Sequence, residues 1–201
     1  MITSRFTISG AVGGVVVPGT ISRSAGGQIG LSEAFEAPAA GVITATVVTM
    51  SPGHGLATGD LVNATWLTGE RRGCSVVVAG NSATVSGGAG DALPSGATVI
   101  ELAKVVVSEF AIDGDLAQLI AFVATASSVT IGVMEGGSES LVLRMEAADP
   151  VLWASGPNST GPFAGLLITE LRIAAGFGGT AGTLVGGTLY DTTVPTPTPT
   201  P

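Results

Sequence analysis

Residues 41–53 read Gly41-Val42-Ile43-Thr44-Ala45-Thr46-Val47-Val48-Thr49-Met50-Ser51-Pro52-Gly53. β-Branched residues fill most of this stretch, and they favour extended backbone because their side chains pack well on a pleated surface. Thr44 and Thr46 lie two positions apart, so in a strand they share one face. Pro52-Gly53 then supplies the residue types of a tight turn. We therefore expect residues 41–50 to form one half-buried strand that ends at this turn.

The same pattern of short apolar runs, punctuated by Gly, Pro, Ser and Asp, continues along the chain. Strands that recur every eight to twelve residues with such punctuation are typical of a β-sandwich or barrel. The only candidate for a helical turn is Ser32–Glu36. The candidate strands are Phe6–Ile8, Gly14–Val17, Gly41–Met50, Leu61–Leu67, Cys74–Ala79, Ala83–Val85, Thr98–Val107, Leu116–Ala124, Val129–Glu135, Ser140–Met145, Leu166–Ala174 and Thr183–Tyr190.

These patterns predict an all-β protein with two small β-sandwich or barrel-like domains and extended terminal arms. Residues 1–107 would form a glycine-rich β domain with an N-terminal arm, and residues 108–194 a β-sandwich domain. Residues 195–201 alternate Pro and Thr, which favours a polyproline II tail.

The charge pattern excludes several classes of partner. The chain has seven Lys and Arg against fifteen Asp and Glu, a net charge of −8, and only Arg71-Arg72 are adjacent basic residues. Nucleic-acid binding relies on clustered basic residues, so we expect none. Leu116–Met134 is uncharged but interrupted by polar residues, and we interpret it as two strands rather than a membrane span. The N-terminus lacks the features of a signal peptide.

Residues that support catalysis or metal binding are scarce. The chain has one histidine, His54, and one cysteine, Cys74, which cannot supply a catalytic triad or a zinc site within one copy. We therefore expect no enzyme activity, no cofactor and no metal. Cys74 is interpreted as a small buried hydrophobe, with an intermolecular disulfide as the alternative. Gly176–Ala181 fits a dinucleotide-binding pattern, but no helix follows it, and we interpret it as a hairpin connection.

Residues 51–62 contain the pattern His54-Gly55-Leu56, two residues, Gly59-Asp60, one residue, Val62. This pattern resembles a turn motif that recurs in structural proteins of tailed bacteriophages. There it connects strands of small β-domains on the virion. The turns that follow, up to residue 107, look like further parts of the same kind of module. The resemblance implies a virion structural role and carries over no catalytic residue.

The composition agrees with this interpretation, because a surface so poor in charge is suited to burial against other subunits. We expect a capsid decoration or stabilising protein that contacts copies of itself and other virion proteins, such as the major capsid protein. A tail tube or tip component, or a bacterial or archaeal surface filament with a glycosylated Pro-Thr tail, is the alternative. The expected location is the virion, assembled in the host cytoplasm, or else the extracellular surface. The candidate contact residues are Trp66, Arg71, Arg72, Trp153, Pro195, Pro197, Pro199 and Pro201.

Overall fold

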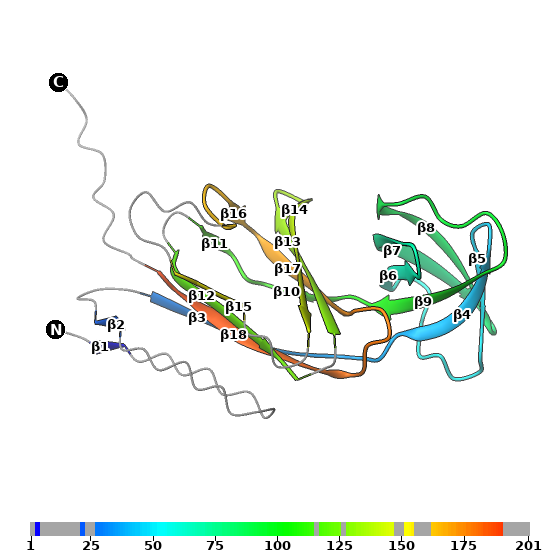
Figure 1. The fold of residues 1–201 in the computed structure, drawn as a ribbon, viewed down its shortest axis with the longest axis horizontal. Coiled ribbons are helices and arrows are strands. Elements are labelled where there is room, and N and C mark those ends of the chain that lie inside the picture. Colours follow the sequence, from blue (N-terminus) through cyan, green and yellow to red (C-terminus); the bar gives the residue numbers. More distant parts are fainter. Residues whose placement is uncertain are drawn as a thin grey trace, which may run out of the picture.

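The computed structural model describes residues 3–4, 21–22, 27–114, 117–125, 128–146, 151–154 and 162–190. Within these residues the fold is all-β and contains no helix. A closed six-stranded barrel lies at one end of the molecule, and two four-stranded sheets lie at the other (Figure 1). The predicted fold class, all-β with sandwich and barrel-like parts, is confirmed.

The barrel is built from one continuous stretch of chain. Its neighbouring strands follow the order β4-β5-β8-β7-β6-β9, and β9 pairs with β4 to close it. Apolar side chains alternate inward along each strand and fill the interior, as in other small barrels. The strands are β4 (Ala39–Thr44), β5 (Val47–Met50), β6 (Leu61–Trp66), β7 (Gly69–Ala79), β8 (Ser82–Gly90) and β9 (Thr98–Lys104).

The stretch expected to be a single strand over residues 41–50 is a hairpin. β4 ends at Thr44, and β5 begins at Val47 and pairs back with β4. Ala45, in the two-residue connection, has a φ of 59°, a left-handed conformation that residues other than glycine rarely adopt. No glycine or proline marks this turn, so Ala45 and Thr46 carry no turn signal at the point where the chain reverses.

The two sheets of the other part face each other and enclose a single core. The first sheet has the strand order β15-β12-β18-β3, and the second has the order β10-β17-β13-β14. Side chains from both sheets belong to one buried cluster, so the two sheets form a β-sandwich. The strands are β3 (Gly27–Phe35), β10 (Val106–Ser108), β12 (Ala117–Ala124), β13 (Ser128–Glu135), β14 (Ser138–Glu146), β15 (Val151–Ala154), β17 (Glu170–Ala175) and β18 (Gly182–Tyr190).

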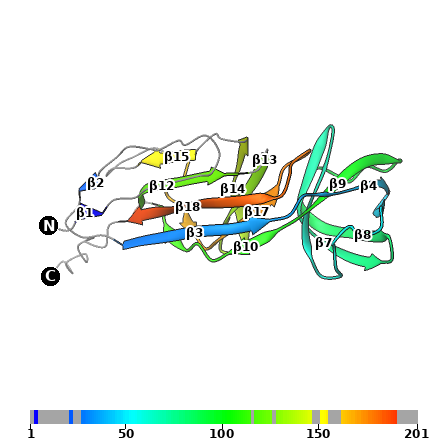
Figure 2. The same cartoon turned by 90° about the horizontal axis from the view of Figure 1, so that it is seen from below.

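The connectivity of the sandwich is that of a jelly roll. Except at the β13–β14 hairpin, each of its strands is followed by one in the opposite sheet. Eight antiparallel strands wound in this way define the jelly roll. The barrel is inserted between its first two strands, β3 and β10. The links are short, residues 36–38 on one side and Val105 on the other, and Figure 2 shows β3 leading directly toward the barrel.

Because the barrel is an insertion, the strands do not divide into one group before residue 107 and another after it, as the sequence had led us to expect. Residues 39–104 form the barrel, whereas β3 pairs along its whole length with β18 of the sandwich. β3 also includes most of the segment expected to form a helical turn. Its Leu31 and Phe35 are buried, and Glu33 between them accepts a hydrogen bond from the buried Ser108 hydroxyl at 2.8 Å. Because Glu33 is polar and lies at an inward position, residues 31–35 do not show the regular alternation of apolar and polar residues that predicts a strand.

Three short elements complete the description. β11 (Ile112–Asp113) pairs with β16 (Leu167–Ile168), and β1 (Thr3–Ser4) pairs with β2 (Ile21–Ser22). The remaining parts of the expected terminal arms lie outside the described residues. Residues 176–181 connect β17 to β18, which belong to different sheets, so the expected hairpin is instead a crossing between the sheets.

Candidate functional site

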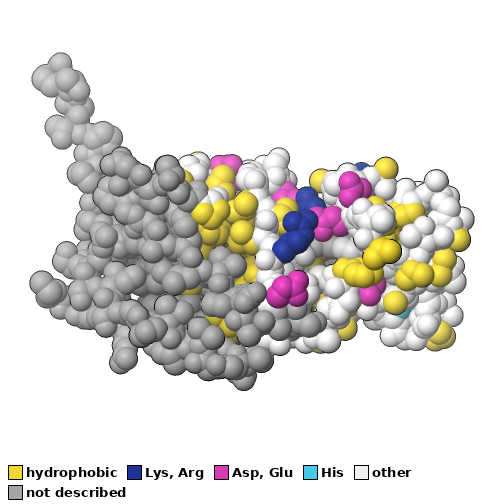
Figure 3. Space-filling view, viewed as in Figure 1, with side chains coloured by type: hydrophobic (Ala, Val, Ile, Leu, Met, Phe, Trp, Pro, Cys, Tyr) yellow, Lys and Arg dark blue, Asp and Glu magenta, His cyan; other side chains and the backbone are white. Residues whose placement is uncertain are grey.

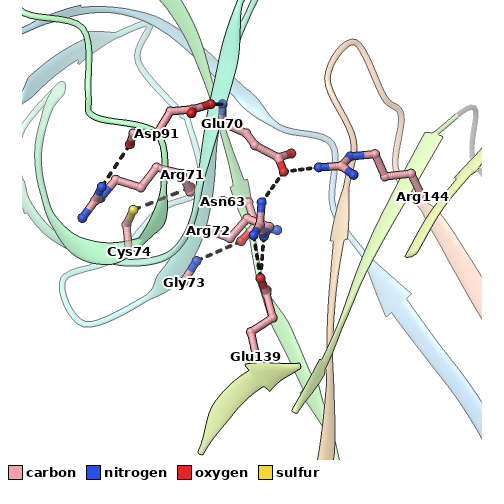
Figure 4. A network of polar contacts seen from close by, with 9 residues as sticks. All are labelled: Asn63, Glu70, Arg71, Arg72, Gly73, Cys74, Asp91, Glu139 and Arg144. Atoms are coloured by element: carbon pink, nitrogen blue, oxygen red, sulfur yellow. Dashed lines mark hydrogen bonds and ion pairs between the residues drawn. The ribbon is translucent and has the colours of Figure 1, made fainter. Parts of the chain in front are cut away.

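A network of ion pairs joins the barrel to the sandwich. Most of the arginine and lysine side chains visible in Figure 3 gather where the two parts meet. From β7, Arg72 reaches Glu139 of β14 through Nε, at 2.8 Å, and through Nη2, at 2.7 Å. Its Nη1 pairs with Glu70, which also accepts from Arg144 of β14 (Figure 4). The network therefore crosses the junction twice.

The electrostatic consequence is clearest at Arg72. Its side chain is only 17% exposed, and the hydrogen bond that it donates to Glu139 is the main cause that raises its pKa, against the opposing effect of burial. Charge-assisted hydrogen bonds in such a partly enclosed site are stronger than exposed pairs. Arg72 therefore makes its ion pairs within the chain, between the barrel and the sandwich.

Arg71 also bonds within its own chain. Its Nη1 donates to the carbonyl of Asp91 at 3.0 Å, and its Nη2 donates to the carbonyl of Gly88 at 2.9 Å. The Asp91 carboxylate in turn accepts from the backbone N–H of Glu70 at 3.1 Å. These bonds hold the end of β8 against the start of β7, so the role of Arg71 in the structure is to fix the barrel rim.

The structure places the other candidate contact residues as follows. Trp66 is 8% exposed and belongs to the barrel core. Trp153 pairs through its backbone with Ile120 in the first sheet, and its side chain lies outside what the structure describes. Pro195, Pro197, Pro199 and Pro201 also lie outside the described residues. Of the candidate residues whose side chains the structure describes, Arg71 and Arg72 bond within the chain and Trp66 lies in the barrel core.

The segment that resembles the phage turn motif forms a braced loop between β5 and β6. These two strands do not pair, so the loop is a crossing rather than a hairpin. His54 Nδ1 accepts from the backbone N–H of Leu56 at 3.1 Å, and Nε2 lies 3.2 Å from the Gly80 carbonyl. Asp60 accepts from the N–H of Ala57 at 2.9 Å. The polar motif residues thus fix the loop that lets Leu56 cover the barrel core.

Cys74 is fully buried in the barrel. Burial raises the pKa of its thiol, and the nearby Arg71 charge opposes that rise. A thiol held in its neutral form is a poor nucleophile and a poor metal ligand. In this conformation Cys74 is a small core residue, and an intermolecular disulfide would require the barrel to open.

The outer face of the barrel carries a feature that the sequence analysis missed. Two rows of side chains run side by side across its strands, one through Val42 and one through Val47. Val99 is 66% exposed and Val77 58% exposed, and no residue of either row is charged. We call this surface the barrel wall. It consists of Val42, Thr44, Val47, Thr49, Val77, Ala79, Ser82, Thr84 and Val99.

The strand register explains why the barrel wall could not be found by reading single strands. Val42 and Val99 are directly opposite each other on β4 and β9, and Val47, Thr84 and Val77 are aligned across β5, β8 and β7. Residues so aligned on one face form a continuous surface. Scattered exposed apolar residues are ordinary, but a contiguous set is typical of an interaction surface.

Among the described residues, no helix has the length and apolar character needed to cross a membrane. Within the same part of the chain, no three His, Cys, Asp or Glu side chains are grouped as metal ligands would be. Comparisons of the chain with protein-family models, curated proteins and solved structures found no match.

Proposed function

We propose that the protein is a structural component of a bacteriophage virion, and specifically a capsid decoration or stabilising protein. In this role it contacts copies of itself and other virion proteins, such as the major capsid protein. The observation that carries the proposal is the barrel wall, an uncharged and partly apolar surface that spans five strands.

Charge explains why the barrel wall suits contact between copies. The chain has a net charge of −8, so identical subunits repel one another wherever their acidic surfaces meet. An uncharged wall is the surface on which two copies can approach without that repulsion, and burying its valines gives a hydrophobic gain. A subunit of a repetitive shell needs such contacts at every copy.

The architecture supports the same proposal. Jelly rolls are frequent in viral capsid proteins, although lectins and cupins share the fold, so fold alone does not assign a function. The inserted barrel adds a second module, which projects from one end of the sandwich (Figure 1). One module can then hold the shell while the other contacts a neighbour. A tail component or a surface-filament subunit would use the same surface, and the location of the native protein distinguishes them.

Sedimentation of the purified full chain tests the role of the barrel wall. We expect concentration-dependent association of the wild type, and its loss in the double variant Val77→Lys, Val99→Lys. Both residues are exposed, so the lysines place charge on the wall with little effect on folding. The control is Leu67→Lys, which replaces one exposed apolar residue by lysine at an 87% exposed turn position outside the wall. A monomeric wild type, or equal association of both variants, would contradict the role of the wall.

Electron microscopy of native particles tests the location. We expect the protein in regular stoichiometry on icosahedral heads. Its presence on tails instead would shift the proposal to a tail component. Recovery from a cell surface with sugars on the Pro-Thr tail would overturn the virion proposal.

A further inference from the structure

A cleft of about 490 Å³ lies beside the ion-pair network, between the barrel and the sandwich. Its size is in the range of small-molecule sites, which often lie between structural units. Barrel strands β6, β7 and β8 line one side, and sandwich strands β13, β14 and β17 line the other. The lining includes several glycines and only one large apolar side chain, Met134, so the cleft is mainly polar.

Both sides of the cleft are shaped by β-bulges. On the barrel side, Val62 pairs with Cys74 and Ala64 with Arg71, so Asn63 faces two residues, Arg72 and Gly73. On the sandwich side the register between β13 and β14 shifts beside Glu139, which leaves one extra residue on β14. Bulges redirect side chains and are frequent next to binding sites. Here they turn Asn63 and Glu139 toward the same space.

Asn63 presents an unused hydrogen-bond donor to the cleft. Its Oδ1 accepts from the backbone N–H of Gly73 at 3.1 Å, which fixes the orientation of the amide. Its Nδ2 has no hydrogen-bond partner among the described residues, although Asn63 is only 6% exposed. Thr65 Oγ1 is the buried side-chain polar atom without a partner among the described residues, so Asn63 Nδ2 is not enclosed and can be reached from the cleft that Asn63 lines.

Arg172 supplies further donors beside Asn63. Its Nε donates to Glu170 at 3.0 Å, and within the described part of the chain its two Nη atoms have no hydrogen-bond partner. Gly73 lies between Arg172 and Asn63: a Cβ on Gly73 would lie 3.3 Å from Arg172 Nη1. Gly73 has a φ of 64°, so both its backbone and its surroundings favour glycine. The absent side chain keeps the space between the two donors open.

Glu139 supplies the acceptor. Its Oε1 is used by Arg72, and its Oε2 has no partner among the described residues. A Cβ on Gly132 would lie 2.8 Å from Oε2, so a glycine again keeps this atom accessible. The surrounding network carries three arginines and three glutamates, which balance in charge. A singly charged ligand is therefore easier to accommodate than a doubly charged phosphate.

We propose that this cleft binds a small hydroxy-carboxylate, such as a sugar acid. The planar carboxylate accepts from the Arg172 guanidinium and the Asn63 amide, and a neighbouring hydroxyl donates to Glu139 Oε2. Arginine forks match carboxylates geometrically, which a single amine does not. The inference rests on the junction alone and does not depend on the proposed virion role or on the barrel wall.

Amide NMR spectroscopy of the full chain, titrated with D-glucuronate, tests the proposal. We expect saturable shifts of the Asn63 side-chain NH₂ signals. Asn63→Asp keeps an oxygen for the Gly73 N–H but replaces the donor by a negative oxygen, and it should weaken binding by ~10- to 100-fold. Arg172→Gln should weaken binding similarly. Lys104→Gln is the matched control, because it removes a positive charge that pairs with Asp60 outside the cleft.

The neutral and simpler analogues separate the parts of the proposal. D-glucose, which lacks the carboxylate, should not bind, and acetate, which lacks the hydroxyls, should bind more weakly than glucuronate. Acetate binding as tightly as glucuronate would overturn the role of Glu139. Absence of saturable glucuronate binding to the wild type, or equal binding to folded Asn63→Asp and Arg172→Gln proteins, would overturn the proposal. Thermal melts of each variant establish that it is folded.

Discussion

The barrel and the sandwich are both built from antiparallel strands, but they are assembled from the chain in opposite ways. The barrel uses residues 39–104 without interruption, and three of its six strand pairs are adjacent in sequence. In the sandwich, the partner of Phe35 on β3 is Gly182 on β18, with the whole barrel and most of the sandwich between them in sequence. Non-local pairing must overcome a larger loss of chain entropy than local pairing.

The difference suggests that the two parts depend on different features of the sequence. The barrel depends on local connections, such as the Ala45-Thr46 turn and the longer loop braced by His54. The sandwich depends on a larger shared core, which gathers side chains from both sheets and from the segments between them. We expect the barrel to be the more independent folding unit and the sandwich to be the more sensitive to loss of core volume.

The largest expected effect comes from Phe122→Ala in the sandwich. Phe122 is fully buried, and its ring centroid lies 5.8 Å from that of Phe110. The substitution should lower the free energy of unfolding of the sandwich by about 3–5 kcal/mol. Urea unfolding would be followed by circular dichroism, which reports the whole chain. Trp66 fluorescence in a Trp153→Phe background would report the barrel, because Trp66 belongs to the barrel core.

Leu102→Ala is the matched substitution in the barrel, where Leu102 is fully buried. Leu102→Ala should shift the unfolding transition detected by Trp66 fluorescence more than the transition detected by circular dichroism. Phe122→Ala should shift the circular dichroism transition more. If both substitutions shift both signals equally, the two parts unfold as one cooperative unit and the comparison fails.

The next effect concerns the coupling between the two parts. Arg72→Met leaves Glu139 without its partner from the barrel, and it should lower the free energy of unfolding by about 1–3 kcal/mol. It should also separate the fluorescence and circular dichroism transitions. Arg144→Met is the control at the exposed end of the same network, where the side chain is 60% exposed and a change within about 0.5 kcal/mol is expected. Equal effects of both substitutions would show that Arg72 does not couple the parts.

Much of the local structure could be predicted from the sequence. Alternation along the candidate strand Ser140–Met145 predicts that Leu141, Leu143 and Met145 share one face with Arg144 opposite. In the structure the three apolar side chains pack on the sandwich core and Arg144 is exposed. The uncharged stretch from Leu116 was expected to contain two strands, and its described residues form β12 and β13. Alternation within one strand is a local property, which is why it was readable.

What could not be predicted was the arrangement between strands. β12 and β13 follow each other in sequence but belong to different sheets, and alternation is the same in either case. The cleft could not be predicted for the same reason, because its polar side chains come from three different strands, β6, β14 and β17. The register shifts that direct Asn63 and Glu139 toward the cleft arise between paired strands and cannot be recognised in the sequence of one strand. The aligned valines of the barrel wall likewise required the register of five strands.

A pH-dependent effect should be confined to the barrel, because Cys74 lies there. Burial raises the pKa of the folded thiol, so the unfolded chain loses its proton first as pH rises. Stability is therefore fully present below the pKa of the unfolded thiol and falls as pH rises toward that of the folded thiol, by at most about 1.4 kcal/mol per pH unit. Trp66-detected unfolding between pH 7 and 10 measures this slope. The difference between wild type and Cys74→Ala isolates it from other titrating groups, and parallel profiles would contradict the assignment.

The smallest effect tests the turn that the sequence did not reveal. Ala45 has a left-handed φ, which costs a non-glycine residue about 1–2 kcal/mol. Ala45→Gly removes that cost, and the greater freedom of glycine in the unfolded chain offsets about 0.4–1 kcal/mol of the gain. The net expectation is a stabilisation of roughly 0.5–1 kcal/mol in the barrel transition. Thr46, the other residue of the turn, has no positive φ, so Thr46→Gly should instead destabilise. Stabilisation by Ala45→Gly together with destabilisation by Thr46→Gly would show that this turn, rather than strand propensity, sets the β4–β5 register. Destabilisation of similar size by both substitutions would show that the left-handed conformation of Ala45 does not contribute to the register.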